Sequence, residues 1–213
     1  MRKLIFAVSL LIGSVGCNSA PNQPAASPEP AKAAPKTELQ TGRVVLQKLY
    51  TTARMWASDA QPIRLESQAQ SPQSSEEAKE NIGKAPLWRG SFASPARGLQ
   101  KPFMWSGLAG PDAPERGITP GSEDSFSPNN TFTQPFDLAY LKTDSEKAFE
   151  VAQAHGGSAL LKKSPKTPVN YVLDWDPRKK QLVWHVIYGQ NPHDPQLQIA
   201  VDASTGGYIR KEV

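Results

Sequence analysis

The sequence predicts an α+β fold made of two tandem small modules, each a helix packed on a curved antiparallel sheet. Two observations predict it. Apolar residues recur at helical spacing in 46–57 and again in 146–155. Each of these segments is followed by pairs of short runs rich in aromatic and β-branched residues, which is typical of hairpins. The 213 residues are enough for one large or two small domains.

The first module is expected to cover residues 41–141. Its helix ends before Pro62, because the residue preceding a proline disfavours the helical region. A short strand at 63–66 follows, and then a hairpin whose strands cover 87–94 and 99–106. Aromatic side chains alternate along the two hairpin strands, at Trp88, Phe92, Phe103 and Trp105.

The second module is expected to cover residues 142–213. Thr-Asp-Ser-Glu at 143–146 resembles a capping box, in which Glu146 reaches back to the start of the helix. Gly156 suits the left-handed residue that ends a helix. The hairpins of the two modules can be laid over one another, with Trp88 on Tyr171, which suggests an internal duplication. The strands expected after the second helix cover 159–162, 169–175, 181–188, 196–201 and 208–211.

A long loop at 108–135 separates the two sets of strands and is rich in Pro, Gly, Ser and Asn. Loops of this length inside a compact domain are usually functional or disordered. Phe126 and Phe132 argue against full disorder, because their side chains favour burial. Two interpretations stay open: a strap across the modules, or a binding loop.

The N-terminus has the pattern of an export signal. Arg2 and Lys3 precede an apolar run at 4–15 that ends in small residues, so residues 1–16 are predicted to be a signal peptide. The run is shorter than the roughly 20 residues that a helix needs to span a bilayer. A permanent anchor helix is therefore not expected.

The segment Ser-Val-Gly-Cys at 14–17 resembles the lipobox of bacterial lipoproteins. The resemblance implies that the thiol of Cys17 receives a diacylglyceryl group and that Cys17 becomes the first residue after cleavage. An ordinary signal peptide with an incidental cysteine is the alternative. Residues 17–40 are rich in Pro and Ala and predict a semi-extended tether. Asn18 stands where an aspartate would retain a lipoprotein at the inner membrane, so the periplasmic face of the outer membrane is favoured.

Composition and spacing give little sign of chemistry. A net charge of +4, part of it in the signal peptide, does not suggest a nucleic-acid partner. A single cysteine excludes an intramolecular disulfide and a multi-cysteine metal site. Asp174, Asp176 and His185 could meet across a hairpin and hold a divalent ion, but a solvated strand end explains them more simply. His155 and His193 show no ligand spacing. We expect no metal, no cofactor and no enzymatic activity.

The last 70 or so residues resemble a PepSY domain, a module with a cystatin-like, helix-on-sheet fold. The resemblance rests on the helix 146–155, the strand 182–186 and the segment 199–209, which reads as an apolar strand, Asp-Ala, a small polar pair, glycine and a second apolar strand. In this turn Asp202 is expected to accept backbone N–H bonds and Gly206 to supply a positive φ. PepSY domains occur as propeptide inhibitors of thermolysin-type metallopeptidases and as isolated envelope proteins, so the resemblance implies a peptidase as one kind of partner.

These observations predict a non-enzymatic binding module in the bacterial cell envelope. Its partner is expected to be an envelope protein, bound through an aromatic sheet face, the loop 108–135 or a sheet edge. A cell-wall or glycan ligand stacked on exposed aromatic rings is the alternative, and core packing is the simplest explanation of the same rings. The candidate binding residues are Trp88, Trp105, Phe126, Phe132, Trp175 and Trp184.

Overall fold

The computed structural model describes residues 36–68, 81–130, 133–190 and 194–213, which belong to one compact unit. The predicted signal peptide, Cys17, most of the tether and Phe132 lie outside the described residues. In the part of the chain that the structure describes, no helix combines the length and the apolar character needed to cross a bilayer.

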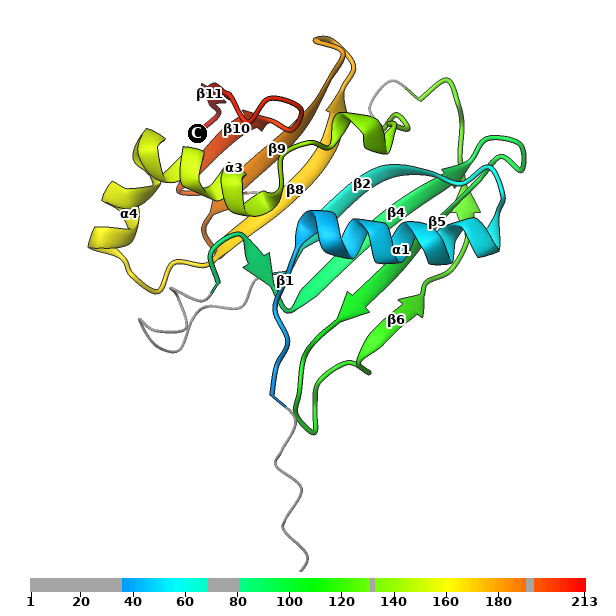
Figure 1. The fold of residues 1–213 in the computed structure, drawn as a ribbon, viewed down its shortest axis with the longest axis horizontal. Helices are drawn as coiled ribbons and strands as arrows, with labels where there is room; N and C mark the ends of the chain where they lie inside the picture. The colour runs from blue at the N-terminus through cyan, green and yellow to red at the C-terminus, as the bar shows by residue number, and fades with distance from the viewer. Residues whose placement is uncertain (1–35, 69–80, 131–132, 191–193) are drawn as a thin grey trace, which may run out of the picture. The chain divides into compact units, whose positions relative to one another are not determined.

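A single antiparallel sheet runs through the unit, so the fold is α+β with one large sheet (Figure 1). The strand order is β11-β10-β9-β8-β2-β4-β5-β6, and β7 pairs with β5 beside β6. At the centre of the sheet β2 pairs with β8, with Leu65 opposite Leu173. A separate short pair joins β1, Gln40–Thr41, to β3, Lys84–Ala85. The sheet strands are β2 Gln61–Ser67, β4 Leu87–Ser94, β5 Leu99–Ser106, β6 Gly117–Pro120, β7 Asp124–Ser125, β8 Val169–Asp176, β9 Gln181–Tyr188, β10 Leu197–Asp202 and β11 Tyr208–Lys211.

The helices cover one face of this sheet (Figure 1). Helix α1, Gly42–Trp56, packs on β2, β4 and β5, and helix α3, Ser145–Ala152, packs on β9 and β10. A distorted turn, Gln153–Gly157, leads from α3 into α4, Ser158–Lys163, and a short 3-10 helix, Leu138–Tyr140, precedes α3. None of these helices packs on the other face, which we call the helix-free face.

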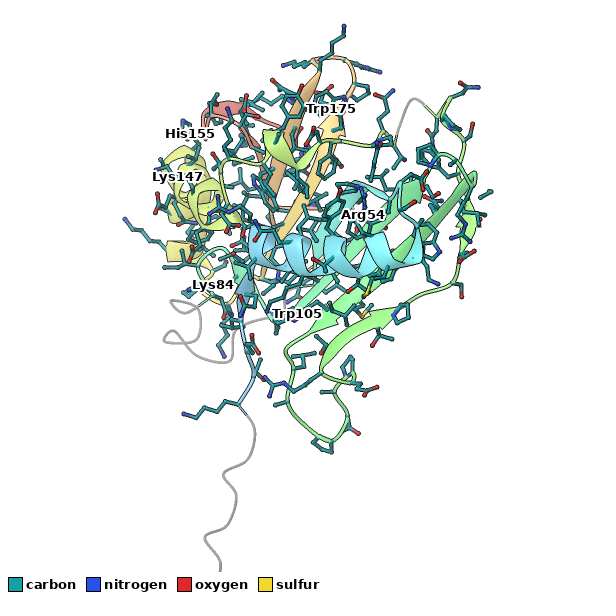
Figure 2. The ribbon with its side chains drawn as sticks, turned by 45° about the vertical axis from the view of Figure 1, so that its right-hand side comes forward. Arg54, Lys84, Trp105, Lys147, His155 and Trp175 are labelled. Atoms are coloured by element: carbon teal, nitrogen blue, oxygen red, sulfur yellow. The ribbon has the colours of Figure 1, made fainter. Side chains whose placement is uncertain are left out.

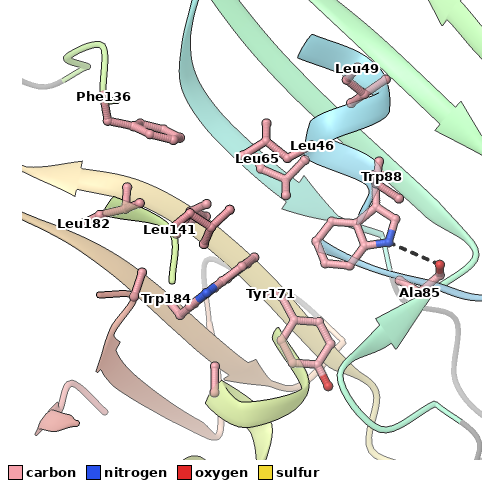
Figure 3. Packing of buried hydrophobic residues seen from close by; sticks show 14 of the residues in the cluster. Leu46, Leu49, Leu65, Ala85, Trp88, Phe136, Leu141, Tyr171, Leu182 and Trp184 are labelled. Carbon is pink, nitrogen blue, oxygen red and sulfur yellow. Dashed lines mark hydrogen bonds between the residues drawn. The ribbon is translucent and has the colours of Figure 1, made fainter. Parts of the chain in front are cut away.

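Large aromatic side chains fill the space between the helices and the sheet (Figure 3). Trp88 on β4 and Trp184 on β9 are fully buried. The indole nitrogen of Trp88 donates to the carbonyl oxygen of Gln40 at 3.0 Å, and that of Trp184 donates to the carbonyl oxygen of Thr143 at 2.9 Å. Each acceptor lies two residues before the first residue of a helix. Trp184, and not Tyr171, therefore makes the indole-to-carbonyl bond that corresponds to the bond of Trp88. This differs from the overlay proposed from the sequence, which placed Trp88 on Tyr171.

The N-terminal ends of α1 and α3 meet and share one capping carboxylate. Asp144 precedes α3, and its Oδ1 accepts from the backbone N–H of Ser145 at 2.7 Å and from that of Arg43 at 2.9 Å. Its Oδ2 accepts from the hydroxyl of Thr41 at 2.6 Å. The first N–H groups of a helix have no partner within the helix, so one carboxylate here satisfies donors of both helices.

Ser145 completes this junction from the buried side. Its hydroxyl accepts from the backbone N–H of Gly42 at 2.8 Å and donates to the carbonyl oxygen of Gly83 at 2.6 Å. Glycine is required at both partners. A Cβ on Gly42 would lie 2.4 Å from the Trp184 ring, and Gly83 has φ +65° and lies against the backbone of Glu146.

Several predicted elements are confirmed and others are wrong. The hairpin strands β4 and β5 have the predicted bounds, and β8 and β9 agree within one residue. The strand expected at 159–162 is wrong. These residues lie in α4, because Gly156, with φ +122°, bends the chain and the helix resumes instead of ending. Glu146 forms an ion pair with Lys84 at 3.2 Å and does not close the predicted capping box, since Asp144 caps α3.

The loop 108–135 is not structureless, because it contains β6 and β7 and extends the sheet beyond β5. The turn after β10 is confirmed in detail. Oδ1 of Asp202 accepts from the backbone N–H of Ser204 at 2.7 Å and of Thr205 at 3.0 Å, and Gly206 has φ +74°. The carbonyl oxygen of Ala203 in this turn accepts from Thr143 at 2.7 Å, so the turn fixes the segment that leads into α3.

We predict that Ser145→Ala destabilises the protein, because it leaves the N–H of Gly42 and the carbonyl of Gly83 buried without their partner. The expected loss is about 1–3 kcal/mol for each orphaned group. Ser158→Ala is the matched control, because the Ser158 hydroxyl is exposed and bonds only locally, to Gln153 at 3.1 Å. Urea denaturation of both variants measures the difference, and equal stabilities of the two variants would contradict the role of the junction.

Candidate functional site

A row of alternating charges crosses the helix-free face. Alternate residues of a strand point to opposite faces of a sheet, so the neighbours of the buried aromatic residues point away from the helices. Arg89 on β4 forms an ion pair with Glu66 on β2 at 3.3 Å, and Glu66 contacts Arg64 at 3.1 Å. Arg64 then forms an ion pair with Asp174 on β8 at 2.7 Å. The row thus crosses the central β2–β8 pair.

His185 on β9 continues the row toward the C-terminus. Its Nε2 lies 3.2 Å from Oδ1 of Asp174, and its Nδ1 lies 2.7 Å from Oε2 of Glu212. Gln198 on β10 donates to the same oxygen of Glu212 at 2.6 Å, and Arg210 pairs with the other. Both ring nitrogens face carboxylate oxygens, an arrangement that favours the imidazolium, in which both nitrogens are donors.

The surroundings of His185 shift two pKa values. Burial by itself lowers the pKa of His185, but the hydrogen bonds and charges of Asp174 and Glu212 outweigh it and raise the pKa to about 9. For Glu212, burial raises the pKa, but the hydrogen bond and charge of His185, with Arg210 and Gln198, hold it below its usual value. His185 therefore keeps its proton at neutral pH, where a general base would need a pKa near 7.

The charged side chains cover apolar residues that no helix covers. Val183 and Ala200 are fully buried and Val172 and Ile187 nearly so, although all four belong to the helix-free side of their strands. Long charged side chains can lie over apolar surface while their charged ends stay in water. The charged row is therefore also a polar layer over the outer side of the sheet.

Three hollows lie along the helix-free face. The first, about 430 Å³, spans β2, β8, β9 and β10 and is lined by Arg64, Glu66 and His185 among others. The second, about 470 Å³, lies over β4 and β5 between Ser91 and Ser122. The third, about 380 Å³, lies over β5 and β6.

The three hollows are neighbours along this face, and we call them together the trough. Arg89 and Pro102 line both the second and the third hollow. The Arg89–Glu66 ion pair stands between the first hollow and the second, since Glu66 lines the first and Arg89 the second. The trough crosses seven neighbouring strands from β10 to β6, a span of about 30 Å at the usual strand spacing.

The described members of the set of aromatic residues proposed from the sequence as binding residues do not line the trough. Trp88, Trp184, Trp105 and Phe126 are 0, 0, 4 and 7% exposed. The three tryptophans pack between the sheet and the helices, and Phe126 packs on Ile63 and Ala93. These four side chains belong to the core, which agrees with core packing as the simplest explanation of the aromatic pattern in the sequence.

Trp175 is half-buried near the β8–β9 turn (Figure 2), with its ring centroid 5.2 Å from that of Tyr140. Phe132 lies outside the described residues.

The structure brings together two of the three residues that the sequence suggested as possible metal ligands. Asp174 and His185 do meet across the β8–β9 hairpin, but Asp176 accepts from the backbone N–H of Arg178 at 3.0 Å and lies 4.0 Å from Arg210. Among the described residues no cluster of three or more His, Cys, Asp or Glu is placed to hold a metal ion.

Arg64, Glu66 and Arg89 were not proposed as site residues. The alternation of charged residues with Leu65 was the signal that could have identified the first two.

No protein-family model, no curated protein and no solved structure matches this chain. The PepSY resemblance is therefore neither supported nor opposed by these comparisons.

We predict that His185 makes stability depend on pH in the alkaline range. Its pKa is higher in the folded state than the unfolded value near 6.5, so the contribution is fully present below pH 6.5 and is lost as pH rises through about 9. The rise of this one pKa from 6.5 to about 9 corresponds to a contribution of about 3 kcal/mol at most to the free energy of unfolding.

Urea denaturation between pH 6 and pH 10 measures this dependence. We expect the dependence of stability on pH to be weaker in His185→Gln than in the wild type. His155→Gln is the control, because His155 is exposed on the other side of the sheet, and this variant should keep the wild-type dependence. The same slope in the wild type and in His185→Gln would contradict the account.

Proposed function

We propose that the protein is an exported, lipid-anchored, non-enzymatic binding module that holds a segment of another envelope protein in the trough. The observation that carries this proposal is that three hollows follow one another across a sheet face on which none of the described helices packs. An elongated depression suits an extended polymer better than a compact small molecule.

The lining of the trough favours a polypeptide over a glycan. Its described residues supply guanidinium, carboxylate, amide and hydroxyl groups, and these can bond the N–H and C=O groups of a peptide backbone. Sugar rings would be expected to stack on aromatic side chains, but the described residues that line the three hollows include none with an aromatic ring other than the imidazole of His185. Of the described tryptophans on which the glycan alternative was based, only Trp175 is partly exposed, and it does not line these hollows.

The PepSY resemblance belongs to the same proposal. Two cystatin-like modules would be joined edge to edge through the β2–β8 pair into one sheet, each with its helix on the same side. The matching indole-to-carbonyl bonds of Trp88 and Trp184 support a duplicated unit. A peptidase as partner is the further step that the PepSY resemblance suggests.

The lipid anchor of the proposal rests on the sequence alone. Cys17 would carry the lipid, and the predicted tether after it would hold the folded unit away from the periplasmic face of the outer membrane. The tether would end before residue 40, where the prediction placed its end, because the N–H of Glu38 donates to the carbonyl oxygen of Gly107 at 2.8 Å and Gln40 belongs to β1. A tethered module of this kind meets its partners at the membrane surface.

We predict that a photo-crosslinking amino acid placed in the trough captures a polypeptide in native envelopes. Ser91 and Ser122 line the second hollow, while Thr51 is exposed on α1 and serves as the control position. We expect one discrete protein adduct from the two trough positions and none from Thr51, analysed by gel shift and mass spectrometry. The same adducts from Thr51, or adducts to cell-wall glycan alone, would contradict the proposal.

We also predict that Cys17→Ser abolishes membrane attachment. The wild-type chain should partition into the detergent phase and carry the mass of a lipid on its N-terminal cysteine, whereas the variant should stay in the aqueous phase. A wild-type protein cleaved elsewhere, with an unmodified Cys17, would exclude the anchor but leave the trough unaffected.

A further inference from the structure

The third hollow differs in chemistry from the rest of the trough. Met104 and Pro102 on β5 form its base, and Pro114 and Pro120 stand on its rim. The two rim prolines are exposed, and Met104 is only half-buried. An apolar depression left in contact with water is typical of a binding surface.

Two opposite charges stand on the rim of this hollow. Arg89 lies on the side nearer the centre of the sheet and Glu115 on the loop before β6. Arg89 forms its ion pair with Glu66 through Nη1, and a guanidinium has five N–H donors. A peptide unit on either side of an inserted side chain would find a donor group on one rim and an acceptor group on the other.

The neighbouring sheet edge is unsuited to a different mode of binding. β6 is a short edge strand that ends in Pro120, which has no N–H to offer to an added strand. A partner is therefore expected to approach this part of the sheet from its face, where the hollow opens, and not to extend the sheet at its edge.

We propose that the third hollow is the anchor site of the trough, and that it takes one apolar side chain, such as that of leucine, from an extended segment of the partner protein. This inference rests on the proposed function, because the segment is the one that the trough holds. The apolar lining supplies the affinity, and the charges of Arg89 and Glu115 orient the backbone around the inserted side chain.

Two methionines of the chain can serve as the reporter for this site and as its control. Of its three methionines, Met1 belongs to the predicted signal peptide, Met104 forms the base of the hollow, and Met55 is 77% exposed on α1, on the opposite side of the sheet. With ¹³C-methyl methionine in the full chain, held in detergent micelles, the two methyl signals are followed during titration with N-acetyl-leucine methylamide.

We expect the Met104 methyl signal to shift with saturation while that of Met55 stays in place. N-acetyl-alanine methylamide should bind at least about tenfold more weakly, since it buries several fewer methyl and methylene groups. Thr119→Phe, which places a ring opposite Met104 on the same face, should abolish the shift, whereas Thr51→Phe on α1 should not.

Three outcomes would overturn the anchor site: no saturable shift of Met104, equal shifts of Met104 and Met55, or equal affinities for the leucine and alanine probes. The result is separable from that of the crosslinking experiment. Adducts from Ser91 without a Met104 shift would leave the proposed function standing and remove the anchor. A Met104 shift without any polypeptide adduct would leave an apolar site and remove the proposed function.

Discussion

The arrangement of the whole unit depends on the junction at which the first turns of α1 and α3 share Asp144 and Ser145. Helix ends carry unsatisfied N–H groups, and here two such ends are satisfied by the same two side chains. Because Ser145 also bonds the carbonyl of Gly83 ahead of β4, the junction ties segments that lie far apart in the sequence. Both helices are thereby held on one side of the sheet, and in the described part of the chain no helix packs on the other side.

On a sheet face without a helix, apolar residues are exposed to water unless other side chains cover them. The alternating row from Arg89 to Glu212 does so, because it covers Val172 and Val183 with paired charges. The imidazolium of His185 lies between two carboxylates, so deprotonation would leave Asp174 and Glu212 facing each other across a neutral ring. The polar layer therefore stabilises the fold and, at the same time, shapes the surface to which we assign binding.

Local pattern predicted much of the fold, while features that depend on distant contacts escaped it. The bounds of β4 and β5 and the turn at Asp202 follow from alternation and turn chemistry within a few residues. The continuous sheet could not be predicted, because the β2–β8 pair joins residues more than 100 positions apart. For the same reason the aromatic rings looked available for binding. Only the packing of α1 and α3 shows that Trp88 and Trp184 are enclosed.

A partner held in the trough would cover the helix-free face, and not the helical side, in the envelope. Oxidation of the two mature methionines by hydrogen peroxide tests it directly, with sulfoxide measured at Met104 and Met55 in purified protein and in native envelopes. We expect Met104 to oxidise more slowly in envelopes than in purified protein, and Met55 to oxidise at the same rate in both. Unchanged oxidation of Met104, or protection of Met55 in its place, would contradict it.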